Sequence, residues 1–251
     1  MGRKAPCVVD PERIIYLMIR NLEQGRKKLY LYGDIRYGGK GFVKKFFREL
    51  ALSGITHEHI VFEFFYPATE EYLKKWREWA DKNSCTLEAT YSPESGSEKV
   101  RSLLGKPCTN KAIVNHCKLV ASHGIPQSTY FMFGLPGQDF AEIEETLKLA
   151  EEIIKIYVSA GFDRNSVRHD VVAYTFMQIP DAGSQLFINP EKYGFHLNFN
   201  GFSGLVKMLS SARDWTEAIG YHTDNFTTEE LAKTYKMIRR KMLDLYDKYG
   251  L

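Results

Sequence analysis

The sequence predicts an α/β protein with a parallel sheet, on the basis of two observations. Short apolar segments alternate with helical segments of about ten or more residues, which is typical of β-α crossovers between parallel strands. The strand segments also contain continuous apolar runs, such as Ile60-Val61-Phe62 and Tyr130-Phe131-Met132-Phe133. Continuous runs are expected when helices cover both faces of a sheet. Five such strands can form an open sheet or most of a barrel.

The elements follow in a regular order from the N-terminus. Asp10 and Pro11 supply an N-cap and a first helical residue, and apolar residues repeat at helical spacing until Gly25. Thr69 stands at the N-cap position of a later helix. The patterns predict strands at 29–32, 59–65, 85–91, 128–133 and 167–176, and helices at 42–52, 69–83, 98–104, 109–123 and 139–160.

The pattern changes after residue 176. Residues 177–200 are rich in Pro, Gly and Asn, and they contain too many aromatic residues for a simple linker. Two helices close the chain, at 202–215 and 228–249, the second led by a capping-box pattern. We therefore expect a β/α part at 1–176 and a C-terminal extension at 177–251 that packs on it.

Composition excludes several classes of protein. The 34 Lys and Arg exceed the 31 Asp and Glu by 3, an excess too small to argue for nucleic acid. No apolar run approaches the about 20 residues of a membrane span, and the first ten residues lack the apolar core of a signal peptide. Four cysteines, at 7, 85, 108 and 117, form no C-x-x-C pair, which favours a reducing compartment. We expect a cytoplasmic protein with neither a nucleic-acid nor a membrane partner.

Candidate site residues follow the predicted strands. Ligands of parallel α/β folds bind at the carboxyl ends of the strands, where the loops meet. Gly, Pro, Asp and Ser are also common there because turns need them, so any one loop is a weak signal. The candidates are Gly33, Asp34, Glu63, Ser92, Glu94, Ser95, Gly96, Gly134, Leu135, Pro136 and Gly137.

Two of these loops point more strongly to a ligand. Glu94-Ser95-Gly96-Ser97 ends a strand and opens a helix, so its backbone N–H groups can point at an anionic or hydroxyl-bearing ligand, and Glu94 can accept hydrogen bonds from hydroxyls. Gly134-Leu135-Pro136-Gly137 allows the close approach of a planar ligand, and Gln138 or Asp139 caps the next helix. Neither loop pairs a nucleophile with a base.

Three segments occur in a fixed order along most of the chain: Gly33-Asp34, then Ser92-Pro93-Glu94-Ser95-Gly96-Ser97-Glu98-Lys99-Val100-Arg101 followed by Gly105-Lys106-Pro107, then Thr129-Tyr130-Phe131-Met132-Phe133-Gly134-Leu135-Pro136-Gly137-Gln138. In this order they resemble the radical SAM superfamily. A further stretch, Asn189-Pro190-Glu191-Lys192-Tyr193-Gly194-Phe195 after Asp181-Ala182-Gly183-Ser184, is similar to the uncharacterised group that carries a cobalamin-binding domain ahead of the radical SAM core.

The resemblance implies a fold, cofactors and residue roles. The fold is a partial (β/α)6 TIM-like barrel, here lacking its first strand and followed by C-terminal helices. The cofactors are S-adenosylmethionine, a four-iron, four-sulfur cluster held by three cysteines and, for that group, cobalamin; the enzymes cleave S-adenosylmethionine reductively and act on a small-molecule substrate by methyl or radical transfer. By position in the family pattern, Gly33 and Asp34 match the residues that contact the methionine amino group. Glu94 to Gly96 match the residues near the ribose and the carboxylate, and Gly134 to Gly137 match those that make backbone contacts to the adenine.

One feature of the family is absent from this sequence. The C-x-x-x-C-x-x-C loop and the strand before it are missing, and thiolates are what hold iron in such clusters. We therefore expect the cluster-loop and cobalamin-binding segments upstream in a longer protein, and we expect this chain alone to be inactive. Without that strand the edge at 29–32 is exposed, which favours self-association.

Two other readings stay open. The chain can be a complete but degenerate barrel that binds a nucleoside-like ligand or a partner protein without catalysis. It can also be an unrelated α/β enzyme that uses Asp34, Glu63 or Glu94 as an acid or base.

Overall fold

The computed structural model describes residues 9–163, 171–176 and 184–251. The main sheet is parallel, and its strands follow in the order β1-β2-β3-β4-β5. A second, antiparallel sheet pairs β6 with β7. The α/β fold with a five-stranded parallel sheet is therefore confirmed.

Contacts along the chain divide the protein into two compact units. Unit 1 comprises residues 1–92 and 115–128, and unit 2 comprises residues 93–114 and 129–251. The expected boundary at residue 177 stays a prediction. The two units are described separately below.

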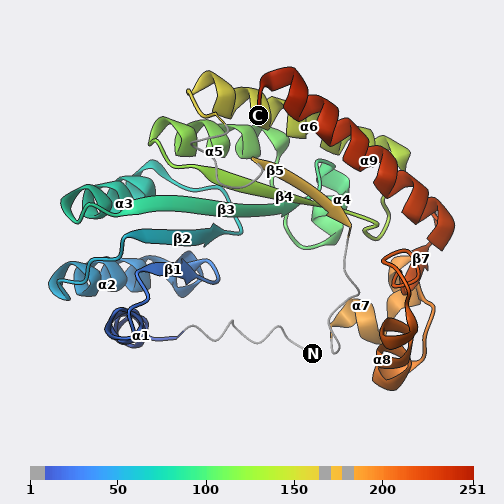
Figure 1. Ribbon diagram of the computed structural model, residues 1–251, viewed down its shortest axis with the longest axis horizontal. Coiled ribbons are helices and arrows are strands. Elements are labelled where there is room, and N and C mark those ends of the chain that lie inside the picture. The colour runs from blue at the N-terminus through green and yellow to red at the C-terminus, as the bar shows by residue number, and fades with distance from the viewer. Residues whose placement is uncertain (1–8, 164–170, 177–183) are drawn as a thin grey trace. The chain divides into compact units, whose positions relative to one another are not determined.

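Unit 1 is built from β-α repeats (Figure 1). The helix predicted at Asp10 and Pro11 is present, and the Asp10 side chain accepts a hydrogen bond from the N–H of Glu12. At the next predicted cap, Thr69 stands at the N-cap but its side chain makes no capping bond. The elements are α1 Pro11–Glu23, β1 Lys28–Leu31, η1 Ile35–Gly38, α2 Gly39–Leu52, β2 His59–Phe64, α3 Glu70–Lys82, β3 Thr86–Glu94 and α5 Asn110–Ser122.

Aromatic side chains fill the core of unit 1 between β2 and its helices. Phe62 stacks on Trp76 with ring centroids 4.8 Å apart and an interplanar angle of 10°. Phe46 of α2 and Phe64 of β2 are fully buried in the same cluster. Offset and edge-on aromatic contacts stabilise beyond the area they bury, so this cluster gives the loops after β1 and β2 a rigid base.

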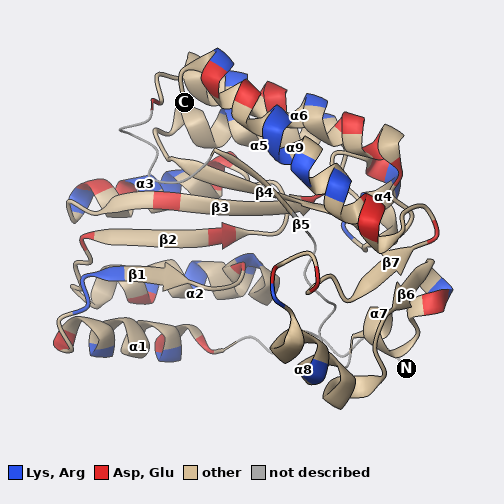
Figure 2. Cartoon of the chain, turned by 45° about the vertical axis from the view of Figure 1, so that its right-hand side comes forward, with Lys and Arg blue, Asp and Glu red and all other residues tan. Residues whose placement is uncertain are grey.

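Unit 2 contains the long helices α6 and α9, which pack against each other; α9 also packs on β5 (Figure 1). Figure 2 shows acidic and basic residues along both helices, and Lys241 and Lys248 of α9 pair with Glu144 and Glu151 of α6. None of the described helices is long and apolar enough to cross a bilayer. The elements are α4 Glu98–Leu103, β4 Gln127–Phe133, α6 Phe140–Ser159, β5 Val172–Phe176, α7 Gln185–Ile188, η2 Pro190–Tyr193, β6 Phe195–Leu197, α8 Gly201–Ser211, β7 Tyr221–Thr223 and α9 Thr228–Tyr249.

The structure differs from the predicted elements chiefly in its strands. β3 runs on through Pro93 to Glu94, past the predicted end at Tyr91. The β6–β7 hairpin was not predicted, because strands of three residues are too short to show a period. The predicted start of β5 at residue 167 lies outside the described residues.

Candidate functional site

Asp34 follows β1 and is only 5% exposed. Its Oδ1 accepts hydrogen bonds from the backbone N–H and the Nε of Arg36, at 3.0 and 2.8 Å. Its Oδ2 accepts from Arg36 Nη2 at 2.5 Å and from the N–H of Phe65 at 3.1 Å. A carboxylate offers about four acceptor sites, so this one is saturated by the chain itself. The contact of Asp34 with an amino group stays a prediction; in this structure the carboxylate positions Arg36.

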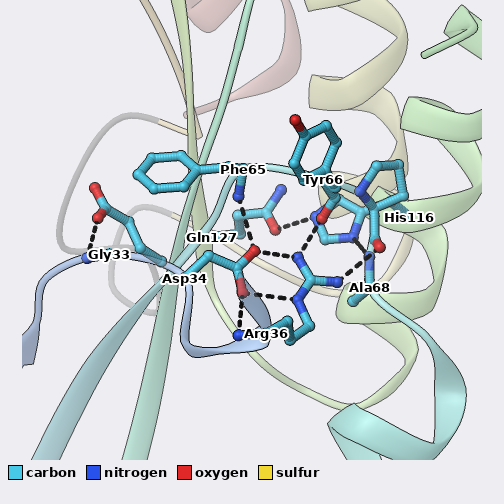
Figure 3. Close-up of polar contacts among 10 residues, drawn as sticks. Gly33, Asp34, Arg36, Phe65, Tyr66, Ala68, His116 and Gln127 are labelled. Atoms are coloured by element: carbon cyan, nitrogen blue, oxygen red, sulfur yellow. Dashed lines mark hydrogen bonds and ion pairs between the residues drawn. The ribbon is translucent and has the colours of Figure 1, made fainter. Parts of the chain in front are cut away.

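Arg36 joins the loop after β1 to the loop after β2 (Figure 3). Its Nη1 donates to the carbonyl of Pro67 at 2.8 Å, and its Nη2 donates to the carbonyl of Tyr66 at 2.5 Å. The guanidinium also lies over the ring of Phe64, 5.0 Å from the centroid. A planar, fork-shaped cation suits this combination of carboxylate, carbonyls and ring, which a lysine could not bind together.

Glu63 of β2 holds the turn at Gly33. Its Oε2 accepts a hydrogen bond from the N–H of Gly33 at 2.6 Å, and its Oε1 accepts one from the hydroxyl of Tyr30 at 3.1 Å. Gly33 has a φ of +89°, a backbone conformation that glycine adopts without a steric cost. Both carboxylates predicted at this end of unit 1 therefore bind the protein's own groups.

His116 of α5 fixes the start of the segment that leads into α3 (Figure 3). Its Nδ1 accepts a hydrogen bond from the N–H of Ala68 at 2.9 Å, so Nε2 carries the proton and donates to Gln127 Oε1 at 2.9 Å. Burial lowers the pKa of His116 to about 3, so the ring is neutral at physiological pH. Nothing in the sequence distinguished this histidine from a residue of a helix face.

In unit 2, Glu94 ends β3 with a φ of +70°. This left-handed conformation is uncommon for a glutamate, and it turns the chain sharply at the end of the strand. The Glu94 carboxylate forms an ion pair with Lys106, and the Glu94 side chain is 15% exposed. Ser92, another candidate, is half-buried in the same strand.

The next three residues are locked to the protein by their N–H groups. Ser95 N–H donates to the Pro93 carbonyl at 2.9 Å, and Ser97 N–H donates to Ser95 Oγ at 3.1 Å. Gly96 N–H donates to Thr146 Oγ1 of α6 at 2.9 Å, and a Cβ at Gly96 would collide with the backbone of Thr146. The prediction that these N–H groups point at a ligand is therefore wrong, because they are used to seat the loop on α6.

Arg101 is fully buried beneath this loop. Its Nη1 donates to the Ser95 carbonyl at 2.6 Å, and its Nη2 donates to the Cys108 carbonyl at 2.6 Å and to Asn110 Oδ1 at 2.8 Å. Glu98, on the same helix, lies at the outer limit of an ion pair, at 4.0 Å. Arg101 thus ties the loop at 95–97 to the segment at 105–110 that carries Lys106.

The loop Gly134 to Gly137 is organised by Gln138. Gln138 Oε1 accepts hydrogen bonds from the N–H groups of Gly134 at 2.9 Å and Leu135 at 3.3 Å. Of the two residues predicted to cap the next helix, Gln138 and Asp139, it is Asp139 that does so, in a capping box with Glu142. Gly134 has a φ of +85°, and a Cβ there would collide with the Tyr221 hydroxyl of β7.

The two loops of unit 2 contact the same helices, α4 and α6. A Cβ at Gly137 would come within 3.1 Å of Leu103 Cδ1, at the far end of the helix that the loop at 94–97 opens. Burial raises the pKa of Tyr174, whose hydroxyl lies near Thr146 and Gln138. Thr146 holds the first loop and Gln138 holds the second, so unit 2 brings two of the three predicted segments together. Sequence reasoning missed Arg101 and Thr146, since both stand in ordinary helical positions.

Comparison with known proteins identifies the family. The chain matches the model of the Radical SAM superfamily over residues 2–150, more than half of its length. It therefore belongs to the radical SAM superfamily, as the order of its loops predicted. The chain is also similar to the "Uncharacterized protein MJ0966" of Methanocaldococcus jannaschii, with 35% identity over 77 residues. That match covers 29% of this chain and spans 17% of the length of that relative.

Membership of this superfamily implies S-adenosylmethionine and a four-iron, four-sulfur cluster. The described cysteines do not fit the cluster. Cys85 and Cys117 are buried, and burial raises the pKa of Cys85 to about 11, which opposes the thiolate that iron requires. Within 9–163, 171–176 and 184–251, no three His, Cys, Asp or Glu side chains gather into a metal-ligand set.

Proposed function

We propose that unit 2 binds the adenosyl part of S-adenosylmethionine, and that the protein acts in a radical SAM reaction whose cluster ligands lie outside the described residues. The observation that carries this proposal is the position of the two loops. The family resemblance assigns the loop at 94–96 to the ribose and the loop at 134–137 to the adenine. Both loops contact the same two helices: the first opens α4 and bonds to Thr146 of α6, and the second leads into α6 and lies near Leu103 at the end of α4. A nucleoside presents its sugar and base to adjacent groups in the same way.

The chemistry of the loop at 134–137 suits an adenine. The N–H groups of Gly134 and Leu135 are bonded to Gln138 Oε1, and the Leu135 carbonyl accepts from the Gln138 N–H at 3.2 Å. The acceptors that we expect this loop to offer to a ligand are therefore the carbonyls of Gly134, Pro136 and Gly137. The exocyclic amino group of adenine is a hydrogen-bond donor. It therefore pairs with backbone carbonyls, which need no particular side chain at the contact.

Glu94 supplies the matching acceptor for the ribose. Ribose hydroxyls donate hydrogen bonds, and an ionised carboxylate is a strong acceptor for them. Lys106 forms an ion pair with Glu94. Arg101 fixes the segment that carries Lys106 by donating a hydrogen bond to the Cys108 carbonyl. Glu94 is also the one carboxylate among the predicted residues of unit 2.

Calorimetry with S-adenosylhomocysteine and 5′-methylthioadenosine tests this proposal, because neither needs the cluster. We expect both to bind and methionine, which lacks the nucleoside, to bind far more weakly. Glu94→Gln should weaken both nucleosides about tenfold, since it removes a charged acceptor. Glu71→Gln, at an exposed position of α3, is the matched control and should leave binding unchanged. Unchanged affinity in Glu94→Gln, or no binding to the wild-type chain, contradicts the proposal.

A second candidate is a module that binds a nucleoside-like ligand without chemistry. It is favoured by the poor fit of the described cysteines to a cluster. Anaerobic reconstitution with iron and sulfide, followed by dithionite and S-adenosylmethionine, separates the two. We expect no 5′-deoxyadenosine from the printed sequence alone and its formation when a three-cysteine segment is supplied upstream. A protein that then holds a cluster but forms no product supports the binding module.

The remaining parts of the proposal rest on the sequence. They are the closure of the sheet as a partial barrel, the cobalamin-associated group, a small-molecule substrate and a cytoplasmic location. Residues 189–195, which suggested that group, form η2 and the start of β6, whereas 181–183 lie outside the described residues. Hydroxocobalamin retained through gel filtration of the longer protein, and detected by its absorbance, would support that assignment; its loss would contradict it.

Self-association through β1 is a further part of the proposal. β1 stands at one end of the strand order; Tyr30 within it and Tyr32, which follows it, are 47% and 87% exposed. An exposed strand edge offers unpaired backbone groups to a second chain. Static light scattering should show a mass that rises with concentration, and a mass equal to the monomer throughout would contradict this expectation.

A further inference from the structure

The segment 221–226, which comprises β7 and the turn after it, holds the loop at 134–138 at several points, although it lies beyond the residues that match the family model. Asn225 Nδ2 donates a hydrogen bond to the Gln138 carbonyl at 3.1 Å. The Tyr221 hydroxyl lies against the Cα of Gly134, where a Cβ would collide with it. These contacts reach both ends of the loop.

Phe226 packs beside the loop on its two flanks. Its ring makes edge-on contacts with Phe133, which precedes the loop, and with Phe140, which follows it, at centroid distances of 5.7 and 5.0 Å. Phe226 is 2% exposed. A pair of aromatic contacts of this kind fixes a segment more firmly than the same apolar area alone.

The turn is itself rigid. Thr223 N–H donates to the Phe226 carbonyl at 2.9 Å, and Phe226 N–H donates to Thr223 Oγ1 at 3.1 Å, which places Asn225 at the tip. The Tyr221 ring stacks on Phe195 of β6 with centroids 4.2 Å apart. The hairpin therefore presents Tyr221, Asn225 and Phe226 in one fixed arrangement.

We propose that Asn225 and Tyr221 are positioning residues that pre-organise the loop at 134–138 for the nucleoside, so that the C-terminal extension is part of the cofactor site. This inference rests on the proposed function of unit 2. Asn225 fixes the carbonyl of Gln138, the residue whose side chain binds the N–H groups of Gly134 and Leu135. Binding to a loop that is already ordered avoids the free-energy cost of ordering it.

The coupling works in both directions. If the hairpin stabilises the binding conformation of the loop, a bound nucleoside must stabilise the hairpin by the same free energy. Hydrogen exchange on the full chain, measured with and without ligand, can therefore detect this coupling. S-adenosylhomocysteine should slow exchange in peptides covering 134–138 and also in peptides covering 221–226.

Asn225→Ala is the direct test. We expect S-adenosylhomocysteine to bind about fivefold more weakly, as for the loss of one neutral hydrogen bond, and exchange at 134–138 to quicken in the absence of ligand. Asn198→Ala is the matched control, because Asn198 directly follows β6, the partner strand of β7, but its side chain bonds to Thr228 and His222. It should leave affinity unchanged.

Tyr221→Phe with Gly134→Ala gives a second, independent test. Gly134→Ala alone should weaken binding strongly, and adding Tyr221→Phe should restore part of it by removing the colliding oxygen. Three results would each overturn the inference: an affinity of Asn225→Ala within twofold of wild type, equal losses of affinity in Asn225→Ala and Asn198→Ala, or ligand protection that stops at residue 138.

If the wild-type chain binds no nucleoside, the proposed function is wrong, and so is the part of this inference that concerns the ligand. Hydrogen exchange without ligand then still decides whether the segment 221–226 holds the loop.

Discussion

The strand ends of unit 1 and the loops of unit 2 are stabilised by different chemistry. In unit 1, carboxylates accept from the donors around them: Asp34 binds Arg36, and Glu63 binds a backbone N–H and a hydroxyl. In unit 2, neutral side chains hold the loop N–H groups, since Thr146 binds Gly96 and Gln138 binds Gly134, while Arg101 holds the carbonyls. The carboxylates of the two units also differ in exposure. Asp34 has no acceptor site to spare, whereas Glu94 is engaged by a lysine at a partly exposed position.

The largest effect should come from the one buried cation of the unit 2 loops. Arg101→Met removes the donors for the Ser95 and Cys108 carbonyls and for Asn110. Buried acceptors left without a partner cost about 1–3 kcal/mol each, so we expect a loss of about 3–5 kcal/mol in the free energy of unfolding. Urea denaturation followed by circular dichroism measures it. Arg48→Met, at an exposed position of α2, is the control. Similar losses of stability in both variants would contradict the claim that the buried hydrogen bonds of Arg101 stabilise the fold.

Asp34→Asn tests the charge-based arrangement of unit 1. The variant keeps the shape of the side chain but leaves Arg36, whose side chain is 19% exposed, without its counter-charge. Removing one partner of a largely buried pair is costly, and we expect a loss of about 2–3 kcal/mol by the same denaturation measurement. Nucleoside affinity of unit 2 should change less than in Glu94→Gln. A larger loss of affinity in Asp34→Asn than in Glu94→Gln would reverse the comparison between the two units.

The sequence was informative where the signal is local. The capping box that leads the helix at 228–249, the helix start at Asp10 and the alternation of strands with helices follow from residue types at short spacings, and the structure contains all three. The same holds for the family, because its loops are recognised as short ordered motifs. The glycine at 96 was also identified as part of a site, although its reason is the close approach of Thr146.

What could not be predicted depends on contacts between distant segments. Arg101 resembles any helical arginine until the Cys108 and Ser95 carbonyls are seen around it. The orientation of the N–H groups at 95–97 was predicted wrongly because it also depends on a distant residue: Thr146, which accepts from the Gly96 N–H, lies 50 residues further along the chain. The short strands β6 and β7 carry no periodic pattern, so the contribution of Asn225 was hidden as well.

Acid should weaken unit 1 through His116, whose ring is neutral in the folded protein. Its pKa is lowered by burial to about 3, against an ordinary value of 6.5, so the unfolded chain binds more protons below pH 6.5. The contribution of neutral His116 to the free energy of unfolding is complete above pH 6.5 and is lost as the pH falls towards 3. At pH 5 we expect the free energy of unfolding to be lower by about 2 kcal/mol for this reason. Urea denaturation of wild type and His116→Gln at pH 7.5 and pH 5 isolates this part. An equal loss on acidification in both proteins would show that His116 does not titrate in this way.

The smallest effect should come from one hydroxyl in unit 2. Thr146→Val keeps the shape of a fully buried side chain but removes the acceptor for the Gly96 N–H and the donor to the Glu142 carbonyl. We expect a loss of about 1 kcal/mol in the free energy of unfolding, because a buried N–H without a partner costs about that much or more. Thr146→Ser keeps the hydroxyl and loses a methyl group, so the pair separates hydrogen bonding from packing. If neutral hydrogen bonds seat this loop, Thr146→Val weakens nucleoside binding more than Thr146→Ser does; the opposite order would mean that packing against α6, and not the bond to Gly96, sets the shape of the loop.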